Sequence, residues 1–300
     1  MSEAPTLTDT DAAASTSLRE FEARARAFLE EHVPRRDTVV VTDTMSAEVV
    51  ANEQELQKKI YDAGFAAITQ PKEHGGQGLG EAESMAWGAL TAGYAVPRML
   101  IAISHGMCGP IINLLGTPEQ KAKYLPDLWR ANTLFAQIFS EPGAGSDVAG
   151  LQTRAEKVDG GWLMTGQKVW TSNAQYCDYG VIVARTNPDV PKHQGITMFI
   201  INLRDPAVTI RPLRVATGEY PFNEIFIDSL FIRAHLVRYE QHQVDRTAVV
   251  REACRRRPRG RPGTRPGGPC RPGRGPRARA GHRPPGAAHA RRGRGGYRPR

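Results

Sequence analysis

A glycine-rich loop at Ser140–Asp147 combines residue types that suit anion binding. Glycines let backbone N–H groups approach a ligand closely, and a turn rich in N–H groups favours anions such as pyrophosphate. Ser140 and Ser146 add hydroxyl groups that can donate or accept hydrogen bonds. The same composition also fits an ordinary turn between two elements, since Gly-Ser-Asp turns are common. The residues alone leave both interpretations open.

A second segment, Gly166–Asn173, carries an aromatic residue followed by two hydroxyl groups. The indole of Trp170 offers a flat surface for an aromatic cofactor, and Thr171 and Ser172 can bond to the polar edge of such a ring. The alternative is a strand tryptophan that faces the core. No spacing of Cys and His typical of a metal site accompanies either segment.

Helical patterns precede both segments. Apolar residues recur every three or four positions from Leu18, which predicts a first helix, and the 17 residues before it, rich in Thr, Ser, Ala and Asp, are predicted to be disordered. A capping box at Thr117 and Gln120, with Pro118 in the first turn, predicts a helix that runs to about Trp129. Further helices are expected at 46–64, 81–94 and 104–115.

From Thr133 onward the pattern changes to short segments rich in β-branched and aromatic residues, which turn residues separate. The predicted strands are Gln167–Trp170, Gly180–Arg185, Ile196–Leu203, Val208–Pro212 and Asn223–Ile232. The sequence therefore predicts an α+β protein, with a helical N-terminal domain at 18–132 and an antiparallel β-sandwich or barrel as a middle domain at 133–240.

The net charge of +9 is distributed unevenly. Residues 251–300 hold 17 Arg, no Lys and one acid, so they carry +16, and the residues before them carry −7. Arg, Pro and Gly dominate this tail, and residues 241–300 are predicted to be disordered. No apolar run is long enough to cross a membrane and no secretory signal is evident, so we expect a cytoplasmic protein.

Together these segments resemble the acyl-CoA dehydrogenase family of flavoproteins over residues 18–240. Ser140–Asp147 matches the family's (T/S)-E-P-x-A-G-S-D signature, and Gly166–Ser172 is similar to its G-x-K-x-W-(I/T)-(T/S) segment. Pro71–Gly78 resembles the family's P-x-x-x-G-G-x-G loop. Gly116–Pro126 resembles its G-T-x-E-Q-K-x-x-Y-L-P run. Four matches in the right order make the resemblance specific.

The resemblance implies an FAD-dependent oxidoreductase of lipid catabolism that dehydrogenates an acyl-CoA thioester between its α and β carbons. It implies electron-transfer flavoprotein as the electron acceptor and a homotetramer or homodimer as the assembly. The family fold ends in a C-terminal four-helix bundle, which brings a glutamate base. Glu141 does not match the position of that base, so no catalytic residue, and no metal ligand, is assigned within this chain.

The resemblance also assigns binding roles. The residues expected to contact the flavin are Gln137, Ile138, Phe139, Ser140, Trp170, Thr171 and Ser172. Trp170 would pack on the ring, with Thr171 and Ser172 at its pyrimidine edge. Ser140 would bond near the reactive nitrogen. Ser146 would lie beside the phosphate-bearing part of both the flavin and the acyl-CoA substrate.

The match fades after about Val237, where the helical bundle is expected to follow. We interpret the tail as an out-of-frame reading of a GC-rich gene, since such reading yields Arg, Pro, Gly and Ala. On this hypothesis the C-terminal bundle is missing, and we expect weak FAD binding and little turnover.

Two alternatives remain. Relatives of the family include acyl-CoA oxidases and flavin monooxygenases that use oxygen, and the motifs indicate flavin binding better than they indicate the oxidant. The Arg-rich tail would alternatively bind nucleic acid through phosphate charge. Because Tyr297 is its single aromatic residue, the tail could stack few bases, so no specific nucleic-acid partner is expected.

Overall fold

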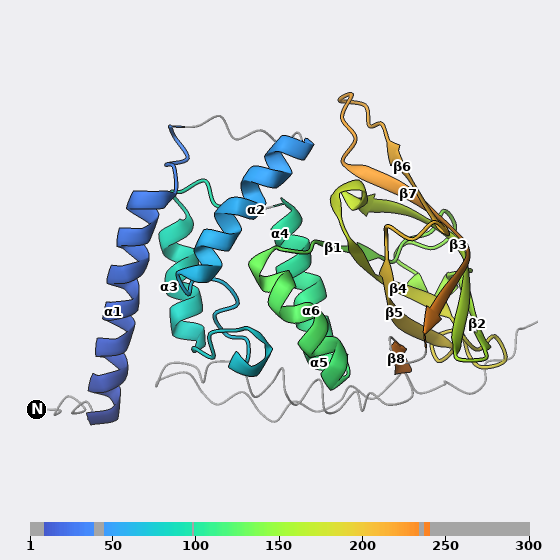
Figure 1. Cartoon of the computed structure of the whole chain (residues 1–300), viewed down its shortest axis with the longest axis horizontal. Coiled ribbons are helices and arrows are strands. Elements are labelled where there is room, and N and C mark those ends of the chain that lie inside the picture. Colours follow the sequence, from blue (N-terminus) through green and yellow to red (C-terminus); the bar gives the residue numbers. More distant parts are fainter. Residues whose placement is uncertain (1–8, 39–44, 98, 234–236, 241–300) are drawn as a thin grey trace, which may run out of the picture. The chain divides into compact units, whose positions relative to one another are not determined.

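The computed structural model describes residues 9–38, 45–97, 99–233 and 237–240. Helices occupy the chain as far as Arg130 and strands follow (Figure 1), which confirms the predicted α+β class. The α-helices are α1 Asp9–His32, α2 Ala47–Asp62, α3 Glu81–Thr91, α4 Met99–Ile103, α5 Gly109–Leu115 and α6 Pro118–Arg130. Short turns are η1 Lys72–His74, η2 Ser104–Cys108, η3 Val148–Gly150 and η4 Ala174–Tyr176.

Helix α1 begins nine residues before its predicted start at Leu18. The run Ala12–Ala14 supplies the strongest helix former, so local propensity extends the helix beyond its apolar stripe. The prediction of disorder over residues 1–17 is therefore corrected for 9–17. The predicted disorder of 241–300 concerns residues outside the described ranges.

The N-terminus of α6 has the predicted capping box. The Thr117 side chain accepts a hydrogen bond from the Gln120 amide at 3.2 Å, and the Gln120 side chain accepts one from the Thr117 amide at 2.9 Å. Pro118 occupies the first turn, where no backbone donor is needed. These contacts begin the helix at the residue that the sequence indicated.

Replacing Thr117 with alanine is expected to lower the free energy of unfolding by about 1 kcal/mol, because the Gln120 amide loses its acceptor. Thr117→Ser keeps the hydroxyl group and is expected to retain most of that stability. Urea unfolding of both variants, followed by circular dichroism, measures the difference. An equal loss in the two variants would contradict a capping role.

The helical part buries an aromatic core of its own. Phe65 stacks on Trp87 with ring centroids 4.9 Å apart, and Phe21 of α1 meets Phe65 edge-on at 5.5 Å. Phe28 and Leu29 complete the buried stripe of α1. The three- and four-residue spacing of this stripe is the pattern that predicted the helix.

The strands form one curled, mixed sheet that closes into a half-barrel. Its strands are β1 Phe135–Ile138, β2 Arg154–Val158, β3 Gly161–Ser172, β4 Tyr179–Arg185, β5 Ile196–Asn202, β6 Val208–Leu213, β7 Phe222–Arg233 and β8 Val237–Glu240. They follow the order β6-β7-β3-β2-β4-β5-β8, and β1 pairs with β4. The β1–β4 and β2–β4 pairs are parallel, so the expectation of a purely antiparallel sheet is corrected at these two pairs.

The long strand β3 bends at two irregularities in its pairing with β7, one between Met164 and Gly166 and one between Lys168 and Thr171. Extra residues in one strand increase its local twist, which helps a sheet to curl. At Gly166 a Cβ atom would lie 2.7 Å from the Cα of Thr153, so only glycine allows this close approach. The second irregularity shapes the candidate site.

The predicted helix at 104–115 is divided in the structure. Helix α4 leads into the π-helical turn η2, in which the Gly109 amide bonds to the Ser104 carbonyl, and α5 follows. The buried Ser104 hydroxyl donates to the Phe135 carbonyl at 3.2 Å and accepts from the Phe135 amide at 2.8 Å. This pair of bonds ties the helical part to strand β1.

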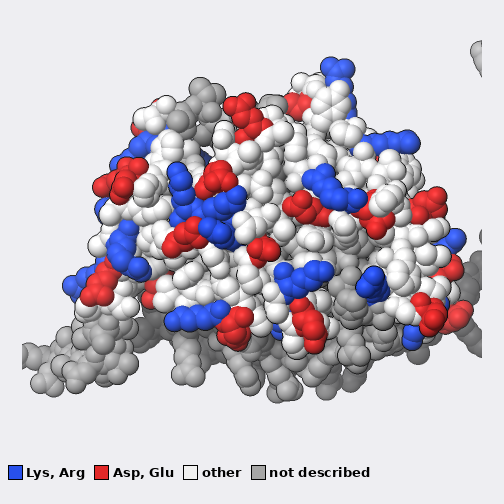
Figure 2. All heavy atoms as spheres, in the orientation of Figure 1, with Lys and Arg blue, Asp and Glu red and all other residues white. Residues whose placement is uncertain are grey.

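Charges of both signs are interspersed over the face shown in Figure 2. Among the described residues, no helix is both long and apolar enough to cross a bilayer. The same residues contain no group of three or more His, Cys, Asp or Glu side chains arranged to hold a metal ion.

Candidate functional site

A cavity of about 250 Å³ opens where β1, β3, α4 and the loop after β1 meet. Its lining residues are Ile103, Gln137, Phe139, Ser140, Val148, Val169, Trp170 and Ser172. One wall carries Ser140, the first residue of the glycine-rich loop, with Gln137 and Phe139 before it. The other wall carries Val169, Trp170 and Ser172 of the second segment.

Trp170 forms the most exposed part of its wall. Its side chain is 59% exposed and meets Phe222 edge-on, with ring centroids 5.8 Å apart. Its φ of +61° lies in the left-handed region that non-glycine residues rarely adopt, at the irregularity of β3. The alternative of a core-facing tryptophan is therefore wrong, because the backbone turns this indole toward the cavity and solvent.

The wall from β1 follows the two-residue alternation of a strand. Gln137 is half-buried and lines the cavity, whereas Ile138 is fully buried in the core of the sheet. Phe139 and Ser140 continue the wall beyond the strand. The Ser140 carbonyl accepts a hydrogen bond from the Val169 amide at 2.9 Å, so backbone bonding joins the two walls.

A buried ion pair lies behind both walls. Lys168 Nζ donates to Glu141 Oε1 at 2.8 Å and to the Phe139 carbonyl at 3.2 Å, and the two side chains are 0% and 5% exposed. The Glu141 carboxylate also accepts from the backbone amides of Gln152 at 2.6 Å and Thr153 at 3.0 Å. The Lys168–Glu141 pair therefore joins β3, the loop after β1 and the approach to β2.

The electrostatics of this pair follow from burial and hydrogen bonding. Burial alone would raise the pKa of Glu141, but hydrogen bonds from Lys168, Thr153 and Gln152 outweigh it and hold that pKa below its usual value. Burial lowers the pKa of Lys168, and Glu141 opposes this change. With every Glu141 oxygen engaged, this carboxylate shapes the loop and is not placed to accept a proton from a ligand.

The glycine-rich loop is also held on its outer side. The Arg185 guanidinium donates to the carbonyls of Ala149 at 2.6 Å and Leu151 at 3.4 Å. Lys192 forms an exposed ion pair with Asp147 at 2.6 Å. These contacts hold the loop in place, while Ser146 is exposed to solvent and does not line the cavity.

Three groups that could take part in chemistry, the His105 imidazole and the Cys108 and Cys177 thiols, are buried in surroundings that leave them unreactive. Burial lowers the pKa of His105 to about 4, and its Nε2 atom lies 2.8 Å from the Leu128 carbonyl. Burial raises the pKa of the Cys108 thiol to about 12 and also raises that of Cys177. A neutral imidazole and protonated thiols indicate packing roles, because the reactive form of a thiol is the thiolate.

Comparison with known proteins identifies this architecture. The model of the acyl-CoA dehydrogenase N-terminal domain matches residues 15–132, and the model of the acyl-CoA dehydrogenase middle domain matches residues 136–230. The chain belongs to the acyl-CoA dehydrogenase family. The resemblance seen in the four sequence motifs is confirmed, and the family is one of oxidoreductases.

The chain covers only part of the acyl-CoA dehydrogenases to which it is similar. The acyl-CoA dehydrogenase FadE34 of Mycobacterium tuberculosis is 44% identical over 192 residues, which are 64% of this chain and 27% of FadE34. The solved ChsE4–ChsE5 complex from Mycobacterium tuberculosis superposes with a TM-score of 0.62 at 25% identity, over 84% of this chain and 62% of the matched one. The chain thus spans less than two thirds of these relatives.

A solved glutaryl-CoA dehydrogenase from Mycobacterium smegmatis shares the fold of this acyl-CoA dehydrogenase family member. Its TM-score is 0.57 at 21% identity, over 76% of this chain and 57% of the other. That structure holds FADH2, in keeping with the dependence of the family on FAD.

The site residues predicted from this sequence fall into two groups in the structure. Those that line the cavity are Gln137, Phe139, Ser140, Trp170 and Ser172. The side chains of Ile138 and Thr171 are buried away from it, at 0% and 2% exposure, because neighbouring strand residues face opposite sides. The predicted flavin contacts of these two residues, and those of Ser146, which stands outside the lining, stay predictions.

Sequence reasoning missed three apolar lining residues, Ile103, Val148 and Val169. Val169 lies inside the matched G-x-K-x-W segment, so its place next to Trp170 was a usable signal. Ile103 comes from α4, and its position depends on the bonds between Ser104 and Phe135 that only the folded chain reveals.

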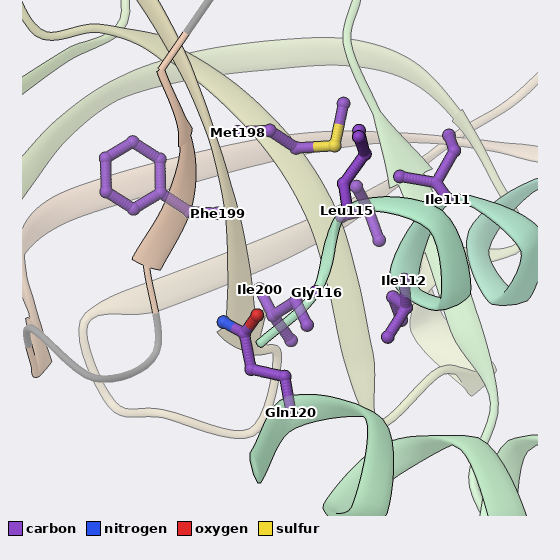
Figure 3. Close-up of a pocket in the computed structure, with 9 residues that line it drawn as sticks. Ile111, Ile112, Leu115, Gly116, Gln120, Met198, Phe199 and Ile200 are labelled. Atoms are coloured by element: carbon purple, nitrogen blue, oxygen red, sulfur yellow. The ribbon is translucent and has the colours of Figure 1, made fainter. Parts of the chain in front are cut away.

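A second cavity, between α5 and β5, is shown in Figure 3. Its volume is about 20 Å³, and Ile111, Ile112 and Leu115 face Met198 and Ile200 across it. Gln120 is its one polar lining side chain. A space of this size holds about one water molecule, so it is a packing gap of the acyl-CoA dehydrogenase fold and not a ligand site.

Proposed function

We propose that the 250 Å³ cavity binds the isoalloxazine ring of FAD and that the chain takes part in α,β-dehydrogenation of an acyl-CoA thioester. The observation that carries this proposal is the convergence of an exposed, conformationally strained Trp170 with two hydroxyl side chains, Ser140 and Ser172, on one cavity. Family membership supports the same function.

The chemistry of the lining fits a flavin ring. Isoalloxazine is flat, with an apolar benzenoid end and a polar pyrimidine end. The cavity offers an indole face and apolar side chains from Ile103, Phe139 and Val169, together with hydroxyl and amide groups. Its volume is slightly below the roughly 300 Å³ at which pockets for whole drug-sized ligands begin, which suits a ring system rather than the whole dinucleotide.

In the proposed reaction a bound flavin would supply the two-electron acceptor. Trp170 would cover one face of the ring and exclude water, while the hydroxyl groups of Ser140 and Ser172 would bond to polar ring atoms. Ser146 would lie nearer the phosphates of FAD and of the acyl-CoA substrate. Glu141 is held by Lys168, so we assign the proton acceptor to a group outside the described residues.

We propose that FAD binding is weak and turnover low in this chain, because the described residues form two walls of a flavin site without a proton acceptor. Where turnover occurs, electron-transfer flavoprotein would accept the electrons, and assembly with further acyl-CoA dehydrogenase subunits would complete the site. Oxygen consumption in the presence of acyl-CoA would instead favour an oxidase.

Adding FAD to the purified chain is expected to raise its melting temperature in a concentration-dependent way, because a ligand that binds the folded state stabilises it by mass action. ADP, which shares a nucleotide with FAD but lacks the ring, should give little or no shift. Equal shifts with FAD and ADP would point to a nucleotide site elsewhere. No shift with FAD at saturating concentration would refute the proposal.

A further inference from the structure

The Lys168–Glu141 pair is the one buried ion pair among the described residues, and it lies directly behind the cavity. Taking two charges out of water is costly, and a well-packed apolar pair of similar volume is often as stable or more so. Stability alone is therefore a weak explanation for an ion pair at this place. Its contacts suggest a second role.

The ammonium group of Lys168 acts on the cavity through one peptide group. Lys168 Nζ donates to the Phe139 carbonyl, which belongs to the peptide that links Phe139 to Ser140. A trans peptide is planar, so the N–H of Ser140 points away from the carbonyl that faces Lys168. Both residues of this peptide line the cavity, whereas Lys168 is fully buried and does not line it.

Polarisation makes this arrangement electrostatically effective. A charged donor on the carbonyl withdraws electron density from the peptide and strengthens its N–H as a donor, and buried hydrogen-bond chains reinforce one another. The pair is fully enclosed, so water screens it little. The ammonium on the carbonyl side of the peptide therefore favours negative charge beside the Ser140 N–H.

We propose that Lys168, held in place by Glu141, is a positioning residue that stabilises the reduced, electron-rich state of a flavin in the cavity by polarising the Phe139–Ser140 peptide. This inference rests on the proposed flavin site. Glu141 fixes the ammonium and, through Gln152 and Thr153, anchors the loop. Lys168 does not line the cavity, so its proposed effect on a flavin is indirect.

The test removes both charges together, so that no unpaired charge stays buried. In Lys168→Met/Glu141→Gln, the single glutamine oxygen can still accept from one of the two amides that bond to different oxygens of Glu141, Gln152 or Thr153. The reduction potential of bound flavin is measured on the full chain against a reference dye. We expect the oxidised-to-reduced ratio at a given potential to rise about tenfold, which is a fall of about 30 mV for a two-electron couple.

Control variants distinguish a change in the flavin potential from misfolding and from failure of the proposed FAD binding. Lys168→Gln/Glu141→Gln is a second neutral pair that keeps a side-chain hydrogen bond, and either neutral variant that folds decides the question. Lys168→Arg retains the charge and should keep the potential near that of the wild type. A neutral variant that binds FAD at the wild-type potential overturns the inference. Failure of the unaltered chain to bind FAD overturns the proposed function instead.

Discussion

Replacing Lys168 alone with alanine is expected to lower the free energy of unfolding by about 3–5 kcal/mol, because Glu141 is left as an unpaired buried charge. The carboxylate is 5% exposed, so solvent cannot replace the lost ammonium. The two backbone amides that bond to Glu141 compensate for only part of the loss. Urea unfolding of the wild type and the variant measures the difference.

Lys192 supplies a matched control for this first prediction. Its ion pair with Asp147 has a similar length, 2.6 Å against 2.8 Å, but its two side chains are 52% and 58% exposed. Lys192→Ala is therefore expected to cost about 0–1 kcal/mol. Similar losses in the two variants would show that burial of the Lys168–Glu141 pair does not determine its contribution.

The pH dependence of the Lys168→Ala effect has a definite sign. The pKa of Glu141 is held below its usual value of 4.5 in the folded wild type, so the stability that Glu141 contributes is present above about pH 4.5 and is lost as pH falls through the folded pKa. In the variant the buried Glu141 carboxylate has lost its ammonium partner, so burial raises its pKa. Protonation in acid then removes the unpaired charge. The stability difference should therefore be largest at neutral pH and shrink in acid.

Sequence patterns predicted the parts of the fold that depend on interactions between residues close together in the chain. The α6 capping box and the apolar stripe of α1 were predicted from neighbouring residues, since caps and helix faces act over one turn. Strand β1 was missed because Phe135–Ile138 is only four residues long and pairs in parallel with β4, a strand more than 40 residues further along the chain. The π-helical turn η2 was missed for a similar reason, because Ser104 is held by Phe135, 31 residues away.

The site shows the same division. The composition of the two segments singled out Ser140, Trp170 and Ser172, which line the cavity, but it left an ordinary turn and a core-facing tryptophan open as alternatives. The orientation of Thr171 was not predictable, because the irregularity between Lys168 and Thr171 changes which residues of β3 face the cavity. The partnership of Lys168 with Glu141 joins residues 27 positions apart, and the spacing alone gives no sign of it.

Trp170→Gly is expected to weaken FAD binding by about thirtyfold or more while leaving the fold intact, on the proposal that Trp170 covers the flavin ring. Loss of a central tryptophan contact typically costs about 2 kcal/mol or more, which corresponds to that factor in Kd. The indole is 59% exposed, so its removal uncovers little core. Glycine also adopts a φ of +61° without strain, and relief of such strain is worth about 1–3 kcal/mol.

Ser229→Gly separates these two effects. Ser229 is exposed, has a φ of +57° in strand β7 and does not line the cavity. Its replacement should bring the same relief of backbone strain, with FAD affinity unchanged. Quenching of flavin fluorescence gives the affinities, and urea unfolding gives the stabilities. Only one of these two strained residues faces the cavity. A loss of affinity in Trp170→Gly alone would therefore show that the strain at Trp170 is maintained for ligand binding. Wild-type affinity in Trp170→Gly would exclude Trp170 from the flavin site.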